Sequence, residues 1–131
     1  MLSKSGIHAV RALIVLAELP EGEYRGASSI AGQNNAPANY LGKLLQQLAR
    51  RGLVHSQKGL GGGFRLARDP GKISLYDIVD AIEDISRWSD CILGRPNCSD
   101  TNPCPVHSRW GPVRDSFLKL LKNTKVADLT P

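Results

Sequence analysis

The chain contains 131 residues, of which 41% are hydrophobic, and 17 Lys and Arg residues against 12 Asp and Glu residues give it a formal net charge of +5. This length fits one compact domain. Because Arg11 and Glu18 interrupt the apolar stretch near the N-terminus, we predict no membrane span and no signal peptide. A soluble, cytoplasmic protein is therefore expected. Residues 1–72 carry ten basic and four acidic side chains, whereas residues 73–131 carry seven and eight, so the positive charge is concentrated in the first half, as expected of a nucleic-acid-binding surface.

The first predicted element is an amphipathic helix over residues 4–19. Its apolar residues recur at helical spacing until Pro20 and Gly22 end the pattern. The predicted apolar stripe contains Ile7, Val10, Ile14 and Ala17, widened by Leu13 and Leu16.

A helix-turn-helix is predicted next. A short helix covers about residues 28–33, and the sequence Asn-Asn-Ala-Pro that follows is typical of a tight turn. A second helix then begins at Pro37 and ends at Gly52. Two helices joined by so short a turn are the arrangement of a helix-turn-helix.

The helix after this turn has one apolar and one polar face. At about 100° per residue the leucines fall together, while the opposite face contains amide and cationic side chains and no carboxylate. Amides and cations suit base edges and phosphates in the major groove of DNA, although an ordinary solvated helix face would have the same composition. The polar face consists of Asn39, Lys43, Gln46 and Arg50, and the apolar face of Leu41, Leu44, Leu45 and Leu48.

A basic β-hairpin, or wing, is predicted after this helix. Strand-like runs over Leu53–Ser56 and Phe64–Ala67 flank a turn that contains four glycines, with Lys58, Arg65 and Arg68 around it. The glycines allow positive φ angles and a close approach to a phosphate backbone, and they also suit an ordinary hairpin turn. Helix, turn, helix and wing in this order predict a mainly α fold with a small β-hairpin (α+β), that is, a winged helix-turn-helix.

Two more helices are predicted in the second half. Ser74 and Asp77 have the spacing of a capping box, and apolar residues follow them at helical spacing. A last helix is expected over Val113–Lys122, with Pro112 in its first turn. A long apolar helix at the end of a small domain indicates a homodimer interface. The apolar stripe of the helix after Ser74 contains Leu75, Ile78, Val79, Ile82 and Ile85.

All three cysteines lie between these two helices, in a loop rich in proline and glycine. Six residues separate Cys91 from Cys98, five separate Cys98 from Cys104, and two separate Cys104 from His107. Thiolates bind both zinc and iron–sulfur clusters, and imidazole can complete either set. Since the close cysteine pairs of structural zinc sites are missing, the spacing favours a cluster, ahead of free cysteines and then of zinc. A ferredoxin would supply four cysteines, so this set suits a labile, sensing cluster.

The stretch "KGLGGGFRLARDPGKISLYDIVDAIE", followed by the three-cysteine loop, resembles the IscR/NsrR-type bacterial transcription regulators, and the resemblance covers nearly the whole chain. It implies a homodimer whose long C-terminal helices cross and whose subunits each carry an iron–sulfur cluster that changes the affinity for DNA. The implied function is a transcriptional regulator, expected to be a repressor, that responds to iron–sulfur status, redox stress or nitric oxide.

The resemblance also implies a ligand set. By position, Cys91, Cys98 and Cys104 are the cysteine ligands and His107 is the fourth, as in the cluster-biogenesis regulator with its 2Fe-2S centre. A 2Fe-2S cluster is therefore favoured, and a 4Fe-4S cluster stays open. The first gap departs from the biogenesis regulator, which has five residues there.

Other positions depart from the family pattern as well. The nitric-oxide-sensing relatives take their fourth ligand from a carboxylate near the N-terminus of the partner subunit. Ile7 stands at the aligned place here and cannot ligate, while His8 beside it is an alternative donor. Gly42 stands where the biogenesis regulator often has a glutamate, which predicts a different operator. His55, on a strand of the wing, is expected to be structural.

The predicted organisation is a winged helix-turn-helix over residues 1–72, a connecting helix over 73–90, a cluster-binding loop over 91–107, and a dimerisation helix with its tail over 108–131. The expected partners are a double-stranded DNA operator and a second copy of the chain, with no membrane and no small-molecule substrate.

No paired acid–base or nucleophilic residues stand out, so no enzyme is predicted. A redox or catalytic loop on a protein-binding winged helix, and a regulator with zinc or thiol-sensing cysteines, are the alternatives. The predicted DNA contacts are Asn39, Tyr40, Lys43, Arg50, Lys58 and Arg65.

Overall fold

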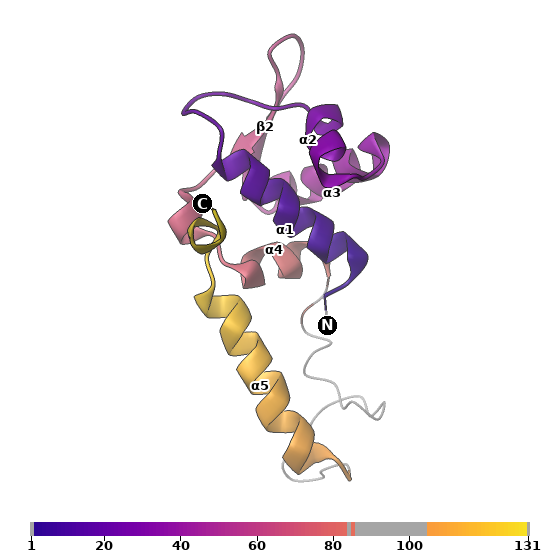
Figure 1. Cartoon of the computed structure of the whole chain (residues 1–131), viewed down its shortest axis with the longest axis vertical. Coiled ribbons are helices and arrows are strands. Elements are labelled where there is room, and N and C mark those ends of the chain that lie inside the picture. The colour runs from indigo at the N-terminus through magenta and orange to yellow at the C-terminus, as the bar shows by residue number, and fades with distance from the viewer. Residues whose placement is uncertain (1, 84, 86–104, 131) are drawn as a thin grey trace.

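The computed structural model describes residues 2–83, 85 and 105–130, without the side chain of His107. Helices dominate this part of the chain, and one antiparallel hairpin forms the wing that projects from the body in Figure 1. This architecture confirms the predicted winged helix-turn-helix fold. The elements are α1 (Lys4–Ala17), α2 (Ala27–Asn34), α3 (Ala38–Arg50), β1 (Val54–Gln57), β2 (Gly63–Leu66), η1 (Pro70–Lys72), α4 (Leu75–Ile82), α5 (His107–Asn123) and η3 (Val126–Leu129).

The turn between α2 and α3 has local causes. Asn35 ends α2 in the left-handed conformation with φ 53°, which asparagine tolerates better than most residues. Pro37 then takes an extended conformation as the residue that caps α3. At the other end, Gly52 adopts φ 75°, and the backbone N–H of Leu53 donates to the carbonyl of Leu48 at 3.1 Å, which closes the helix as predicted.

The buried face of α1 differs from the predicted stripe. Ile7 is 39% exposed, whereas Ala9 and Ala12 are fully buried together with Leu13. Small residues allow close approach, and α1 packs against α2, α3, α4 and β2. The hydrophobic pattern predicted that larger residues such as Ile7 are buried, whereas the structure buries the smaller Ala9 and Ala12.

The core joins the three N-terminal helices to the wing. The four leucines predicted on one face of α3 are all buried, as are Leu53, Val54 and Phe64 at the base of the hairpin. The hairpin pairs Val54 with Leu66 and Gln57 with Gly63. Phe64 also exchanges two backbone hydrogen bonds with Arg25, of 2.8 and 2.9 Å, so the segment before α2 extends the small sheet.

Both helices of the second half differ from their predicted bounds. The helix α4 ends at Ile82 because Glu83 turns to an extended conformation, although Ile85 is still buried against Val79 and Leu121. The helix α5 begins at His107 and contains Pro112 in its interior. Proline cannot donate to the carbonyl of Ser108, but Ser108 is exposed, so water can satisfy that group.

The C-terminal segment returns to the body after α5. Val126 is fully buried in the same core as α1, and its N–H donates to the carbonyl of Ile73 at 2.9 Å. The N–H of Leu75 donates to the carbonyl of Thr124 at 2.9 Å. In Figure 1, α5 extends away from the body of the protein, while the C-terminus lies beside that body. None of the helices in the described residues has the length and apolar character required to span a bilayer.

Candidate nucleic-acid interface

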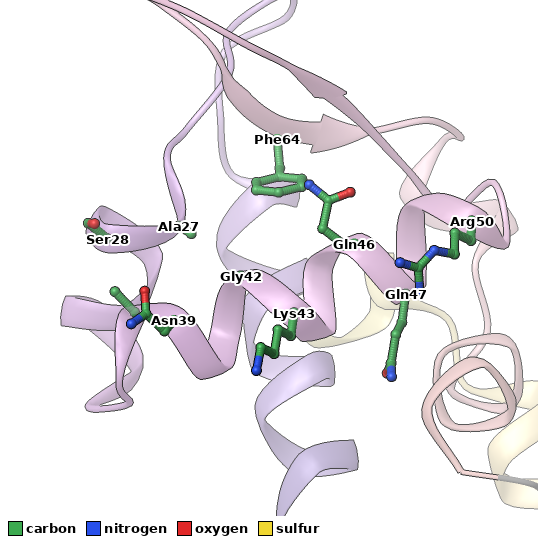
Figure 2. A pocket seen from close by; sticks show the side chains of 10 residues that line it. Ala27, Ser28, Asn39, Gly42, Lys43, Gln46, Gln47, Arg50 and Phe64 are labelled. Carbon is green, nitrogen blue, oxygen red and sulfur yellow. The ribbon is translucent and has the colours of Figure 1, made fainter.

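A groove of about 710 Å³ runs along the outer face of α3. It is bounded by the start of α2 on one side and by β2 of the wing on the other (Figure 2). Its polar side chains from α3 are exposed amides and cations, and no carboxylate lines it. The lining residues are Ala27, Ser28, Ala38, Asn39, Gly42, Lys43, Gln46, Gln47, Arg50 and Phe64.

The periodicity of α3 explains why these side chains share one face. Asn39, Lys43 and Arg50 lie four and seven residues apart, on the side opposite the buried leucines. These three predicted DNA contacts therefore come together in the groove, and Figure 2 shows them spread along the length of the helix. The major groove of B-form DNA is wide enough to admit an α-helix that presents such a face.

Gly42 lies in the middle of the groove. A Cβ atom at Gly42 would lie 3.8 Å from the Cβ of Ala27, which is an ordinary van der Waals distance. The fold therefore does not require glycine at this position. Its effect is to leave bare backbone in the centre of the polar face, between Asn39 and Gln46 (Figure 2).

Tyr40 lies on a different flank of α3 and faces the N-terminal part of α1. Its hydroxyl is 2.6 Å from the Oγ of Ser5, and its ring meets the ring of His8 edge-on at 5.7 Å between centroids. The ring is half-buried against the core. Tyr40 thus fixes α3 to α1, and it lines a second hollow with Ser5 and Lys43 rather than the groove of Figure 2.

The two predicted DNA contacts of the wing lie in different surroundings. Lys58 is exposed just after β1. Arg65 is half-buried on β2, and its guanidinium carbon lies 4.9 Å above the centre of the Tyr24 ring. Because successive residues of a strand point to opposite faces, Arg65 is directed away from the groove that Phe64 lines.

Ser28, Gln47 and Phe64 are among the groove residues that were not predicted as DNA contacts. Ser28 comes from the first turn of α2, Gln47 flanks the predicted polar face, and Phe64 comes from the wing. The position of Gln47 on the helical wheel could have indicated it. The sequence does not indicate which face of the hairpin lies beside α3, so Phe64 could not be predicted as a groove residue.

The predicted cluster ligands are largely outside the described residues. This applies to Cys91, Cys98 and Cys104, while His107 begins α5 and its side chain is not described. In the part of the chain that is described, no three His, Cys, Asp or Glu side chains meet as a metal site. His8, the alternative donor, is half-buried against Tyr40, and His55 is exposed on β1 opposite Arg65.

Two stacked helices, a polar third-helix face and a wing beside it define a winged helix-turn-helix DNA-binding protein. Residues 2–131 match the Rrf2 family, described as iron-dependent transcriptional regulators. A protein of Aquifex aeolicus that carries the name of an HTH-type transcriptional regulator is 36% identical over 122 residues, which cover 90% of this chain and 85% of that protein. The HTH-type transcriptional regulator IscR of Cronobacter sakazakii is 27% identical over 128 residues, 98% of this chain and 78% of that protein.

Solved structures give the same assignment. The structure of CymR, the global cysteine regulator of B. subtilis, has a TM-score of 0.82 and 27% identity, and the match covers 98% of this chain and 95% of that one. IscR of T. potens has a TM-score of 0.76 and 29% identity over 98% and 85% of the two chains. The chain belongs to the Rrf2 family. It is a transcriptional regulator and not an enzyme, and the predicted resemblance to the IscR-type regulators is confirmed.

Proposed function

We propose that this chain is a homodimeric, operator-binding repressor whose affinity for DNA is controlled by an iron–sulfur cluster. The observation that carries the DNA-binding part is the groove along α3, whose exposed side chains are amides and cations and which no carboxylate lines. A surface of this composition attracts phosphates and can read base edges. The concentration of positive charge in residues 1–72 adds to that attraction.

In the proposed complex, α3 lies in the major groove. Asn39, Gln46 and Gln47 are the amides available for base edges, and Lys43 and Arg50 are the cations for bases or phosphates. Lys58 on the wing contacts the backbone of the neighbouring groove. Tyr40 acts by holding α3 in place through the hydrogen bond between its hydroxyl and that of Ser5.

The first prediction concerns Lys43 and Lys58. We expect Lys43→Gln and Lys58→Gln each to weaken binding on the order of tenfold at physiological salt, because each removes a positive charge beside the DNA. The measurement is fluorescence anisotropy with a duplex selected from a random-sequence pool by repeated binding to the wild-type protein. Lys119→Gln is the matched control, since Lys119 is exposed on α5, away from the groove. Equal losses in all three variants would contradict the placement of α3 and the wing.

The cluster part of the proposal rests on the donor set. Cys91, Cys98, Cys104 and His107 supply three thiolates and an imidazole, which fit an iron–sulfur cluster, and the matching family is described as iron-dependent. When bound, such a cluster would be oxidised or lost in response to iron supply, oxidants or nitric oxide. The similarity to CymR, described as a global cysteine regulator, keeps a cluster-free regulator with zinc or thiol-sensing cysteines as the second candidate.

A physical route from the cysteine segment to the DNA surface is available at Glu83. This carboxylate is 8% exposed and accepts a hydrogen bond of 3.3 Å from the backbone N–H of Ser3. The Ser3 hydroxyl in turn caps α1 by accepting from the N–H of Gly6 at 3.0 Å. Because α1 packs against α3, a structural change after α4 can reach the DNA-binding helix through Glu83, Ser3 and α1.

The second prediction tests the cluster. Anaerobically purified protein is expected to be coloured and to contain iron and sulfide, and Cys98→Ser and His107→Ala should lose or alter the visible absorption bands. The measurement is the absorption spectrum with iron, sulfide and zinc analysis. His55→Ala is the control, because His55 is exposed on the wing.

DNA-binding isotherms of the cluster-loaded and cluster-free protein then test the regulation itself. The proposal expects the two curves to separate. A colourless protein with zinc or without metal would favour the second candidate, and superimposed curves would refute control by the cluster.

A further inference from the structure

The tip of the wing carries an apolar side chain in full contact with solvent. Leu60 is 105% exposed, more than any other large hydrophobic residue in the described part of the chain. The next most exposed, Val113 and Leu120, share a face of α5, whereas Leu60 stands alone between glycines. From this position the leucine contributes nothing to the core, and its whole side-chain surface is free to contact another molecule.

The backbone around Leu60 forms a thin, tightly closed tip. Gly59 and Gly61 adopt positive φ angles of 91° and 74°, and the N–H of Gly62 donates to the carbonyl of Gly59 at 3.0 Å. A Cβ at Gly62 would lie 2.3 Å from the carbonyl oxygen of Gln57, so no side chain fits inside the turn. The tip therefore presents one side chain on an otherwise bare backbone.

The base of the wing is held firmly beside the DNA-binding surface. The two backbone hydrogen bonds between Arg25 and Phe64 attach β2 to the segment before α2, and Phe64 lines the groove along α3. Figure 1 shows the tip projecting from this base, beyond the body of the protein. With α3 in a major groove, a projecting wing reaches the adjoining minor groove, whose width of about 6 Å suits a glycine tip.

We propose that Leu60 enters the minor groove as an apolar wedge that packs against the sugars and a base step and bends the DNA. This inference rests on the proposed DNA binding and adds a mode of readout to it. Apolar side chains inserted in this way partly unstack a step and bend the duplex toward the major groove. Since pyrimidine–purine steps such as TA deform most easily, Leu60 gives a preference for them at a position where it makes no hydrogen bond.

The dependence of binding on salt separates the wedge from a phosphate contact. Leu60→Ala is expected to weaken binding to the selected duplex on the order of tenfold at every salt concentration from about 50 to 200 mM, with the slope of log K against log salt unchanged. Lys58→Gln, by contrast, should reduce that slope by about 1, because it releases one counterion fewer. Neither variant should change the melting temperature, as both side chains are exposed.

Bending gives a second readout. Energy transfer between dyes at the two ends of the duplex should show a bend with the wild-type protein and with Lys58→Gln, and a smaller bend with Leu60→Ala. Replacing a TA step at the wing position by a stiff A-tract should weaken wild-type binding and leave Leu60→Ala unaffected.

The outcomes distinguish this inference from the proposed function. Wild-type affinity and bending in Leu60→Ala, with Lys58→Gln weakened, would overturn the wedge and leave DNA binding intact. A wild-type protein that selects no duplex would refute the proposed function itself. A shift in sedimentation of Leu60→Ala, with unchanged DNA affinity, would assign the leucine to a protein contact and overturn the wedge.

Discussion

Gly63 shows how a single residue positions the wing. It adopts φ 130°, and a Cβ atom there would lie 2.4 Å from the carbonyl carbon and oxygen of Arg25. The close approach of these two backbones is what allows the hydrogen bonds between Arg25 and Phe64. A glycine at this position is therefore needed for both its conformation and its lack of a side chain.

The third prediction follows from this contact. Gly63→Ala is expected to lower the free energy of unfolding by about 2 kcal/mol or more and to weaken DNA binding, because the wing must move away from Arg25. Gly32→Ala is the control: Gly32 is exposed within α2 with open space around its Cβ position, and alanine should stabilise the protein by about 0.5–1 kcal/mol. Urea unfolding followed by circular dichroism measures both. A Gly63→Ala protein of wild-type stability would refute the steric argument.

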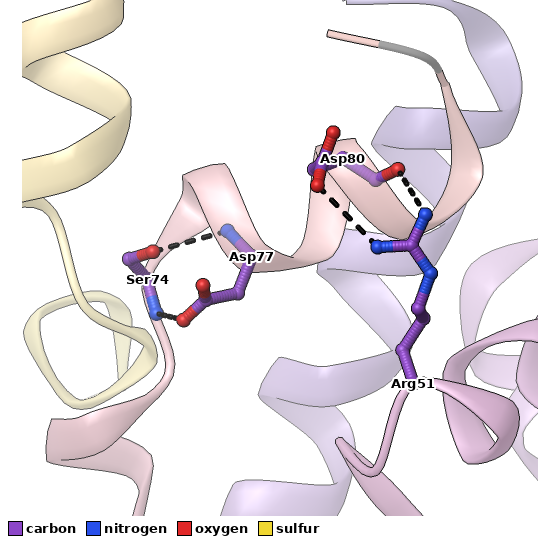
Figure 3. Close-up of polar contacts among 4 residues, drawn as sticks. All are labelled: Arg51, Ser74, Asp77 and Asp80. Carbon is purple, nitrogen blue, oxygen red and sulfur yellow. Dashed lines mark hydrogen bonds and ion pairs between the residues drawn. The ribbon is translucent and has the colours of Figure 1, made fainter.

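The helix α4 is the element that connects the winged helix to α5, and its start is capped by two side chains (Figure 3). The N–H of Asp77 donates to the Oγ of Ser74 at 3.0 Å, and the N–H of Ser74 donates to the Oδ2 of Asp77 at 3.1 Å. This confirms the predicted capping box. Arg51, at the end of α3, reaches the Oδ2 of Asp80 at 3.4 Å, but the two side chains are 56% and 35% exposed.

The fourth prediction compares these two contacts. Ser74→Ala should lower the free energy of unfolding by about 1 kcal/mol, since Ser74 is buried and the start of α4 loses its cap. Arg51→Ala should change it by less than about 0.5 kcal/mol, because water and salt screen an exposed ion pair. Both values come from the same unfolding measurement. A larger loss in the free energy of unfolding for Arg51→Ala than for Ser74→Ala would contradict the prediction that the cap stabilises the protein more than the ion pair.

At the scale of the whole molecule, α5 carries two of the five large hydrophobic side chains that are exposed in the described residues. It is about 25 Å long by its residue count and extends away from the body (Figure 1). Leu121 is buried against α4, whereas Val113 and Leu120 are 59% and 55% exposed and border a hollow that Phe117 also lines. Residues seven apart share one helix face, so this face suits the same face of a second copy.

The fifth prediction concerns this face. Leu120→Glu should convert a dimer into folded monomers and weaken binding to the full operator, because a charge would have to be buried between the subunits. Light scattering after gel filtration measures the mass, and circular dichroism checks that the helices are retained. Lys119→Glu, on an exposed neighbouring position of α5, is the control. A wild-type protein that is monomeric, or a Leu120→Glu protein that stays dimeric, would rule out this interface.

Much of the fold and part of the site could be predicted from the sequence because the signals are local. The leucines of α3 define its buried face, which leaves Asn39, Lys43 and Arg50 outside. The capping box and Gly52 mark helix ends through hydrogen bonds that span only a few residues. The positions of Tyr40 and Arg65 could not be predicted, since Ser5 and Tyr24, which hold them, are distant in sequence.

By itself, the sequence determined the order and type of the main helices and of the hairpin, and the polar face of α3, because helical periodicity and glycine turns are properties of short segments. Only the tertiary structure decided that α1 buries Ala9 rather than Ile7, that Phe64 faces the groove, and that Val126 returns to the core. The physical reason is that these choices depend on which surfaces meet. Close packing between distant segments, rather than any local preference, determines that outcome.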